Sequence, residues 1–364
     1  MNVFEPRLSS WLENAGDDDD VVLSSRIRLA RNLKDEQFPI YEQKEEIVDK
    51  IAGVFDDNFT LFKMNQISHL EKALLVEKHL ISPYMMNKSE YGAVLLNEEE
   101  NVSIMLNEED HLRIQCMTPG LRLFDALEAA LQIDGYVEEK LSYAFDKQFG
   151  YLTSCVTNIG TGMRASVMVH LPGLVTTKRI KSVIEAIRSL GFVVRGIYGE
   201  GSLPASSIFQ VSNQVTLGKT ETEIVEDLTQ VMEQIIMQER IARTTLKQKF
   251  HIALEDRVFR SYGLLTNCRI ISMREASDAI SDVRLGVELG FFEHISMREA
   301  SDAISDVRLG VELGFFEHIS RQKMNELVLF SQPAFLRREA GRDMDELEEK
   351  VIRAKVIREI LGDK

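Results

Sequence analysis

Apolar and polar residues alternate, or apolar residues form short runs, in seven segments of the chain, and this pattern predicts β-strands. The segments are 21–27, 93–97, 102–106, 112–117, 164–171, 192–198 and 207–212. Between them, apolar residues recur with helical spacing at about 66–80, 121–142 and 176–190. Several strands follow one another through short polar turns, as in LLNEEENVSIML, which favours antiparallel pairing. We therefore expect an α+β fold in which helices flank an antiparallel sheet.

From about residue 220 the pattern becomes helical. Thr220 and Glu223 form a capping signal at the start of a segment that predicts one long helix. We place a domain boundary near residue 245. Residues 1–245 are expected to form the mixed α+β domain, and residues 246–364 a mainly helical second domain.

The second domain contains an identical tandem duplication, because the 24 residues of 271–294 recur unchanged at 295–318. A repeat architecture normally shows drifted copies and at least three units. The pair therefore indicates a recent duplication, an engineered insertion or a sequence artefact. Both copies have helical spacing and would compete for one docking groove. We expect one copy to pack as a helix and the other to form an extra helical excursion or a disordered bulge.

The strongest chemical signal lies in CVTNIGTGMRASVMVHLP, residues 155–172. Cys155 precedes a Gly160-Thr161-Gly162 turn, and Arg164 stands at the start of the strand that follows. The glycines let the backbone approach a ligand closely. An arginine offers a forked donor that suits phosphate oxygens. The segment suggests a site where a phosphoryl group meets a second substrate.

Three further segments also place arginines at strand ends beside polar loops. They are Arg26 and Arg28 in SSRIRLARN, Arg113 after Glu108, Glu109 and Asp110 in NEEDHLR, and Arg195 before Glu200 in RGIYGEG. Arg26 and Arg28 lie two apart in a strand and therefore share a face. The alternative is that these arginines are ordinary solvated surface residues. The recurrence of the same arrangement in four segments argues against that alternative.

These blocks, in this order, resemble the signature blocks of the phosphagen kinase catalytic-domain family, and within it the bacterial protein-arginine kinases. The resemblance covers roughly residues 11–250 and continues more loosely to about 361. It implies that Glu109 and Glu200 face the substrate guanidinium and that Cys155 is the active-site thiol. It also implies ATP and Mg²⁺ as cofactors. The nucleotide contacts that it implies are Ser24, Ser25, Arg26, Ile27, Arg28, His79, Arg113, Arg164, Ala165, Ser166, Val167, Met168, Arg195, Gly196, Ile197, Tyr198, Gly199 and Glu200.

These residue types fit phosphoryl transfer to a guanidinium. The guanidinium stays protonated up to a pKa above about 12, so a carboxylate must align it and accept its proton. Arginines neutralise charge on the equatorial oxygens of the transferred group. Mg²⁺ usually keeps several waters and needs few protein ligands, so we expect no dedicated protein metal site. A Cys155 thiolate could hold the substrate guanidinium, although an inert buried thiol is the alternative.

The resemblance implies an ATP-dependent protein-arginine kinase whose product marks proteins for a Clp-type ATPase and protease and disarms a heat-shock repressor. It also implies unfolded protein substrates, a zinc-binding activator protein and a homodimer. The first arginine block begins at Ser24, without the helical domain that precedes it in kinases of small guanidino compounds. We therefore expect a pocket that is open on one side. A kinase for free arginine or another small guanidino compound, and a non-catalytic regulatory binding protein, remain alternatives.

One family feature is only half present. The family's Arg-Asp-x-x-Arg-Ala phosphoarginine-sensing motif corresponds here to Glu349, Lys350, Val351, Ile352, Arg353 and Ala354. Loss of the leading Arg-Asp pair puts activation by phosphoarginine in doubt.

Composition narrows the class of protein. The net charge of -15 and the pI of about 5.1 argue against direct binding of nucleic acid. No apolar run approaches the ~18 residues of a membrane span, and the N-terminus lacks the order of a signal peptide. Three cysteines without framework spacing indicate a reducing cytoplasm. Several polar residues and thiols are expected to have structural roles. Asp17 to Asp20 should form a solvated loop, and Asp110 and His111 should brace the turn that carries Glu109. His170 is expected to be structural, and Cys116 and Cys268 are expected to lie in the core.

Overall fold

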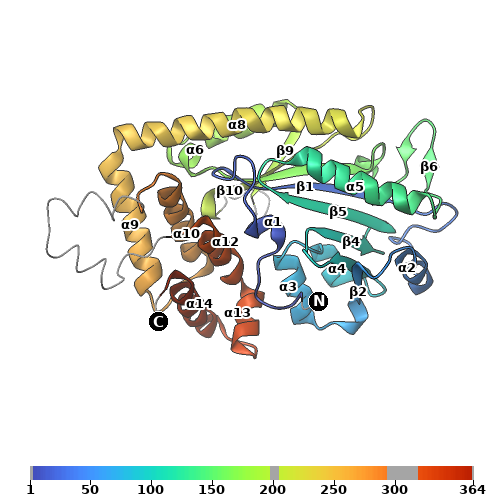
Figure 1. The fold of residues 1–364 in the computed structure, drawn as a ribbon, viewed down its shortest axis with the longest axis horizontal. Coiled ribbons are helices and arrows are strands. Elements are labelled where there is room, and N and C mark those ends of the chain that lie inside the picture. Colours follow the sequence, from blue (N-terminus) through green and yellow to red (C-terminus); the bar gives the residue numbers. More distant parts are fainter. Residues whose placement is uncertain (1–2, 197–204, 293–318, 363–364) are drawn as a thin grey trace. The chain divides into compact units, whose positions relative to one another are not determined.

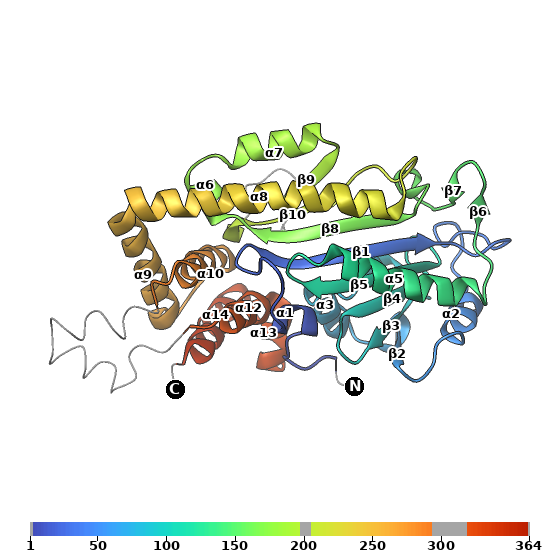
Figure 2. The same cartoon turned by 45° about the horizontal axis from the view of Figure 1, so that its top comes forward.

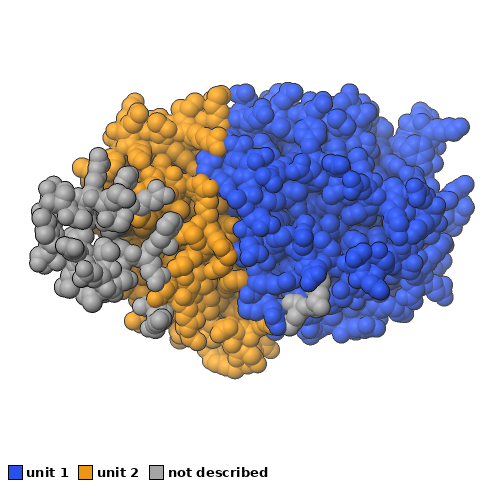
Figure 3. Space-filling model, viewed as in Figure 1, with its two compact units in different colours: residues 1–169, 181–197, 209–236 blue, residues 170–180, 198–208, 237–364 orange. Residues whose placement is uncertain are grey.

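The structure is a computed structural model that describes residues 3–196, 205–292 and 319–362. The chain forms two compact units, coloured separately in Figure 3. Unit 1 comprises 1–169, 181–197 and 209–236, and unit 2 comprises 170–180, 198–208 and 237–364. The border crosses one long helix, so the predicted domain boundary near 245 stays a prediction.

An eight-stranded sheet carries unit 1, with strand order β2-β3-β4-β5-β1-β8-β10-β9. Every strand pair whose register is described is antiparallel, as expected. Figure 1 shows this sheet flanked by helices. The strands are β1 (Val22–Arg31), β2 (Phe59–Lys63), β3 (Ala93–Asn97), β4 (Val102–Leu106), β5 (Leu112–Pro119), β8 (Met163–His170), β9 (Phe192–Gly196) and β10 (Ile208–Asn213), and a separate hairpin joins β6 (Phe145–Asp146) to β7 (Gly150–Tyr151).

Helices cover the sheet through apolar contacts. α5 packs against β1 and β5, the central strands. A buried cluster that includes Leu75, Met85, Val94 and Met105 joins α3 and α4 to β3 and β4. The helices of unit 1 are α1 (Ser10–Glu13), α2 (Glu45–Ala52), α3 (His69–Glu77), α4 (Pro83–Lys88), α5 (Leu123–Glu138), α7 (Ile180–Ser189) and the first part of α8 (Glu221–Lys249), with short 3-10 turns η1 (Met64–Gln66) and η2 (Val156–Asn158). A third 3-10 turn, η3 (Ala205–Ser207), belongs to unit 2.

The capping signal at the start of α8 is confirmed. The Thr220 hydroxyl accepts a hydrogen bond from the Glu223 N–H at 3.2 Å, and the Glu223 carboxylate accepts one from the Thr220 N–H at 2.7 Å. Each side chain satisfies a backbone donor that the first turn of a helix leaves without a partner. The long helix therefore begins where the sequence predicts.

Unit 2 is mainly helical, as expected. Its core contains apolar side chains from four helices, among them Leu265, Ile280, Leu327 and Ile357. The first copy of the duplication supplies α10, whose inner face is buried, whereas the second copy lies outside the described residues. The helices are α6 (Pro172–Thr176), α9 (His251–Asn267), α10 (Met273–Glu288), α12 (Arg321–Phe330), α13 (Pro333–Ala340) and α14 (Glu346–Leu361).

Of the residues expected to be structural, Asp17 to Asp20 are partly or fully exposed, Cys116 is buried, and Cys268 is partly buried against the core of unit 2. His170 is buried and shares a 2.8 Å hydrogen bond with Ser281, both in unit 2. The three cysteines are unpaired, and burial raises the pKa of the Cys116 thiol to about 12. Within the described ranges, every helix is too short or too polar to cross a lipid bilayer.

Candidate active site

Antiparallel pairing brings arginines from three central strands to one face of the sheet. Arg28 of β1 lies directly opposite Arg164 of β8, and Ala30 of β1 lies opposite Arg113 of β5. Residues directly opposite each other share a face, and residues two apart in a strand do so as well. Arg26 therefore joins the same row. The intervening residues Ile27 and Leu29 point to the other face and are fully buried.

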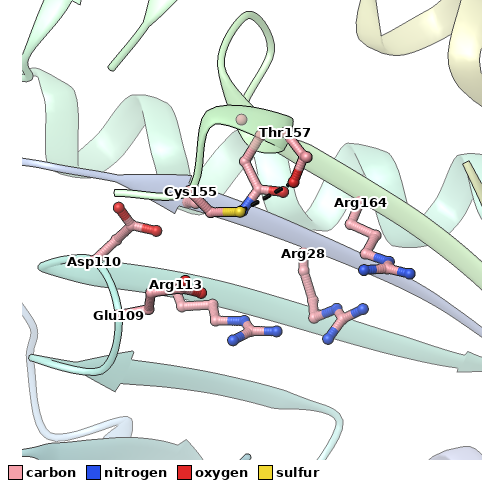
Figure 4. Close-up of a pocket in the computed structure, with 10 residues that line it drawn as sticks. Arg28, Glu109, Asp110, Arg113, Cys155, Thr157 and Arg164 are labelled. Carbon is pink, nitrogen blue, oxygen red and sulfur yellow. Dashed lines mark hydrogen bonds between the residues drawn. The ribbon is translucent and has the colours of Figure 1, made fainter. Parts of the chain in front are cut away.

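A cavity of about 120 Å³ lies over this face of unit 1. Figure 4 shows the guanidinium groups of Arg113, Arg28 and Arg164 in a row below the loop that carries Cys155. The cavity is lined by Arg28, Ala30, Glu109, Asp110, Arg113, Cys155, Thr157, Asn158, Gly162 and Arg164. The structure thus brings together three predicted phosphate-binding arginines, one predicted carboxylate and the predicted thiol.

Burial lowers the pKa of Arg26, Arg28 and Arg164 on this face, and neighbouring positive charges add to the effect. Burial lowers the pKa of Arg26 to about 9, and the charges of Arg113 and Arg164 add to the effect. Burial also lowers the pKa of Arg28 well below its ordinary value, and the charges of Arg26, Arg113 and Arg164 add to this shift, whereas Glu108 opposes it. Within the described chain, the buried Nε atoms of Arg28 and Arg164 have no hydrogen-bond acceptor. Because buried charges normally need a partner, this arrangement favours a polyanion in the cavity.

The loop between β4 and β5 carries three acidic residues with three different environments. Glu108 is buried, and both of its carboxylate oxygens lie 2.7 Å from Nη1 of Arg113. Glu109 is half-buried and faces the cavity. Burial raises the pKa of the Glu109 carboxyl, as do the charges of Asp110 and Glu108, whereas Arg113 opposes the shift. Glu108 therefore holds an arginine, and Glu109 stays available to a ligand.

Asp110 braces this loop, as predicted from its place at the polar break. Its Oδ1 accepts hydrogen bonds from Nδ2 of Asn32 and from the backbone N–H of Ser154, both at 2.7 Å. Asn32 follows β1, and Ser154 immediately precedes the thiol. His111 completes the brace, because its N–H donates to Oδ1 of Asn32 at 2.9 Å. Asp110 thereby joins the carboxylate loop to the thiol loop.

Replacing Asp110 by alanine is expected to lower kcat for arginine phosphorylation about 10- to 100-fold while KM for ATP changes less than about threefold. The substitution leaves two donors without their acceptor and frees the two loops from each other, but it leaves the arginine row intact. Steady-state kinetics with varied ATP and varied acceptor separate the two effects. Asp110→Asn, which keeps an oxygen acceptor, is expected to recover most of the activity. An equal rise in KM for ATP would contradict the assignment.

The thiol loop is held close to the sheet by glycines. Cys155 Sγ lies 3.0 Å from Oγ1 of Thr157, within hydrogen-bond distance. Gly162 has a φ of 64°, and a Cβ there would come within 2.6 Å of the Ala30 carbonyl oxygen. Only glycine adopts this conformation and this approach without strain. The Gly-Thr-Gly turn thus fixes the loop over the arginine row.

His79 lies outside the cavity lining, beside Arg26. Its ring packs edge-on against Trp11 at 6.0 Å between centroids, and its carbonyl accepts a 2.8 Å hydrogen bond from Nε2 of Gln115. Burial lowers the pKa of His79 to about 4, and the Arg26 charge contributes. The imidazole is therefore neutral at pH 7 and can share an anion with Arg26 as a neutral donor.

Other predicted nucleotide-binding residues lie within strands. Ser24, Ser25, Ile27, Ala165, Ser166 and Val167 are buried in β1 and β8. Arg195 is exposed in β9, opposite Gln210, and its charge contributes to the lowered pKa of Arg164. Met168 shares the face of Arg164, and Gly196 ends β9. The predicted residues Ile197, Tyr198, Gly199 and Glu200 lie outside the described residues.

The sequence alone did not single out three residues that contact the site, namely Ser82, Thr157 and Ser212. Ser82, the N-cap of α4, donates to Glu108, and Ser212 of β10 accepts from Nη2 of Arg164 at 3.0 Å. Thr157 contacts the thiol. The only sequence signal for Ser212 is its position at the end of an apolar strand segment. Finding Ser82 requires knowledge of how its segment packs against the loop that carries Glu108, whereas Thr157 lies only two residues after the thiol.

The half-present sensing motif lies in α14 of unit 2. Arg353 is 1% exposed, and its guanidinium donates to the Ser331 carbonyl at 3.0 Å and to the Glu349 carboxylate at 2.5 Å. Glu349 stands where the family motif has arginine, and here it supplies the negative charge that Arg353 needs. Arg353 is thus engaged by a residue of its own helix, and the loss of phosphoarginine sensing stays a prediction.

Known sequences and structures resemble both parts of the chain. Residues 42–242 match the family described as ATP:guanido phosphotransferase, C-terminal catalytic domain. Residues 251–299 and 293–364 each match the protein-arginine kinase McsB C-terminal domain. One copy of the duplication falls in each of these two matches. Two solved structures share the fold. A lombricine kinase has a TM-score of 0.55 and 23% identity, and the match covers 65% of this chain and 70% of that one. A duplicated taurocyamine kinase from Schistosoma mansoni with bound transition state analog components has a TM-score of 0.54 and 21% identity, and the match covers 65% of this chain and 36% of that one.

Curated relatives cover the full length. A protein-arginine kinase of Listeria monocytogenes serotype 4a (strain HCC23) is 93% identical over 364 residues, which is 100% of both chains. A protein-arginine kinase of Geobacillus sp. (strain WCH70) is 50% identical over 369 residues, covering 98% of this chain and 95% of that one. The arginine row, the acidic loop and the thiol loop thus occur in a chain that belongs to the protein-arginine kinase family of ATP:guanido phosphotransferases.

Proposed function

We propose that this enzyme transfers the γ-phosphoryl group of ATP to the guanidinium of arginine residues in proteins. The observation that carries the proposal is the meeting of two opposite kinds of group in one cavity. Arg28, Arg113 and Arg164 suit the phosphates, whereas Glu109 and Cys155 suit a cationic guanidinium. The full-length similarity to curated protein-arginine kinases supports the choice of acceptor.

The residues divide the reaction between them. The arginine row would orient the triphosphate and neutralise the charge that spreads over the equatorial oxygens. Glu109 would align the guanidinium and take its proton as an N–P bond forms and the bond from the γ-phosphorus to the bridging oxygen of ADP breaks. The Cys155 thiolate would hold the guanidinium from the other loop. Glu200 is proposed as the second carboxylate on the strength of the family resemblance.

Mg²⁺ would be held mainly by the phosphates of the nucleotide and would neutralise the charge on the leaving ADP. The site fits this arrangement. The acidic groups that line the cavity are Glu109 and Asp110, beside a row of arginines. The arginine row needs an anion rather than a free cation.

The wider role is proposed from the family resemblance. We place the enzyme in the cytoplasm, as a homodimer, with a zinc-binding activator protein as partner. Its substrates would be a heat-shock repressor and unfolded proteins, and the phosphoarginine would mark them for a Clp ATPase and protease. We propose no direct contact with nucleic acid or membranes.

One labelling experiment tests the activity. Incubation with ATP labelled in the γ-phosphoryl group is expected to give acid-labile label on an unfolded protein, and little or none on free arginine. Mass spectrometry under non-acidic handling should locate the label on arginine side chains. Label on free arginine alone would instead support a kinase of small guanidino compounds, and no label on either would support a non-catalytic binding protein.

A further inference from the structure

Three exposed aliphatic side chains lie beside the thiol loop. Val156 follows Cys155 directly and is 77% exposed, Val215 is 50% exposed, and Leu217 is 52% exposed. We call these three residues the apolar shelf. Single exposed apolar residues are common on protein surfaces, so exposure alone carries no inference. What distinguishes this group is that the structure holds its members together.

Thr216 joins the two segments of the shelf. Its buried hydroxyl donates to the carbonyl oxygens of Thr157 at 3.0 Å and Ile159 at 2.7 Å. Its own carbonyl accepts from the Thr161 N–H at 3.2 Å. Thr216 is buried, whereas Val215 and Leu217 on either side of it are exposed. The shelf is therefore a built surface rather than a chance exposure.

Gly160 permits this close packing. Its φ is 113°, and a Cβ there would come within 2.4 Å of the Thr216 carbonyl oxygen and 2.9 Å of Leu217 Cα. The backbone of the thiol loop thus rests directly on the segment that carries Val215 and Leu217. Any larger residue at Gly160 would push the two segments apart.

More apolar surface borders the same loop. The N–H of Tyr151 in β7 donates to the Gly160 carbonyl at 2.9 Å, and the β6–β7 hairpin exposes Phe145 (57%) and Phe149 (46%). Figure 2 shows this hairpin at the end of the sheet where the chain enters α8. The apolar surface therefore extends on both sides of Gly160.

We propose that the apolar shelf binds apolar side chains that flank the target arginine in an extended polypeptide, so that the enzyme selects unfolded segments. The inference rests on the proposed function. The shelf begins at the residue after Cys155, and the cavity beside it offers the Glu109 carboxylate to a guanidinium. An arginine in that cavity would place its neighbours along the chain within reach of Val156. Folded proteins bury most apolar side chains, so an arginine with accessible apolar neighbours is typical of an unfolded segment.

Peptide kinetics test the proposal with the full-length enzyme. Two peptides of equal length and charge carry one arginine each, flanked either by leucines or by serines. The parent enzyme is expected to show a kcat/KM for the leucine peptide about tenfold higher, in line with partial burial of two apolar side chains. The double variant Val156→Ser, Leu217→Ser should bring this ratio close to one. KM for ATP and kcat/KM for the serine peptide should stay within about twofold, because neither residue lines the arginine row.

Leu190→Ser is the matched control, since Leu190 is 64% exposed and lies outside the shelf. This variant should keep the parent's preference for leucine. Equal kcat/KM values for both peptides in the parent, or a preference that survives in the double variant, would contradict the proposed role of the shelf and leave the proposed function intact. Conversion from dimer to monomer in the double variant, with the preference intact, would make the shelf an interface between copies of the chain and overturn the proposal. No phosphoarginine on either peptide would overturn the proposed function itself.

Discussion

Glu109→Ala is expected to lower kcat/KM for protein-arginine phosphorylation about 10²- to 10⁴-fold. Glu108 holds Arg113, and Asp110 holds the thiol loop, so Glu109 is the carboxylate of this loop that faces the cavity and is available to a substrate. Loss of Glu109 removes both the alignment and the acceptor for the guanidinium proton. Quantitative phosphoproteomics under non-acidic handling should find phosphoarginine from the parent and almost none from the variant.

The control is Glu90→Ala, which removes an exposed carboxylate elsewhere in unit 1 and should leave activity unchanged. Equal phosphoarginine yields from the parent and Glu109→Ala would remove Glu109 from the mechanism. The pH dependence offers a second check. Only the ionised carboxylate can accept the proton, and the pKa of Glu109 is raised above its ordinary value of 4.5. Activity should therefore fall with decreasing pH through a midpoint above 4.5; a midpoint at or below that value would contradict the role.

Arg28→Met is expected to lower kcat about 10²- to 10³-fold and to weaken nucleotide binding. Arg28 lies at the centre of the row, opposite Arg164, and its Nε has no acceptor among the described residues. The methionine keeps an unbranched side chain of similar reach without the charge. Without nucleotide the variant should unfold at the same temperature as the parent or higher, because one of several mutually repelling charges is gone.

Thermal unfolding with and without ATP separates the two effects of Arg28→Met. The parent should gain stability from ATP by linkage, and the variant should gain much less. Arg122→Met serves as the control, because Arg122 forms an exposed ion pair with Asp17 and should change neither quantity noticeably. A variant that loses stability without nucleotide but keeps the full gain from ATP would show that Arg28 supports the fold rather than the phosphates.

The sequence predicted the strands correctly where a polar turn separates two apolar runs. The β3–β4 hairpin has the predicted bounds, because LLNEEENVSIML places a polar turn between two apolar runs. The edge strand β2 was missed, since all five of its residues are partly or fully exposed and FTLFK gives no clear alternation. The short helices α2 and α4 were missed as well, because one or two turns give too few periods to recognise.

The residue types of the site were visible in the sequence, but their partners were not. Asp110 was predicted to brace its turn because a polar run interrupts two apolar strands. Its contacts with Asn32 and Ser154, 78 and 44 residues away, depend on how distant segments pack. The opposition of Arg28 and Arg164 likewise depends on strand register. Register is set by the whole sheet rather than by any local motif.

The two sides of the cavity belong to parts of the fold that differ in how well they tolerate substitutions. The arginine row belongs to three hydrogen-bonded central strands, whereas Glu109 and Cys155 belong to loops. Substitutions in the loops can therefore alter which nitrogen compound is accepted without disturbing the phosphate donor. Grafting residue 109 and the 153–160 segment from a kinase of a small guanidino compound, with Glu108 kept as the partner of Arg113, should shift acceptor choice while nucleotide affinity is retained. This sheet is therefore a suitable scaffold for redesigning N-phosphorylation.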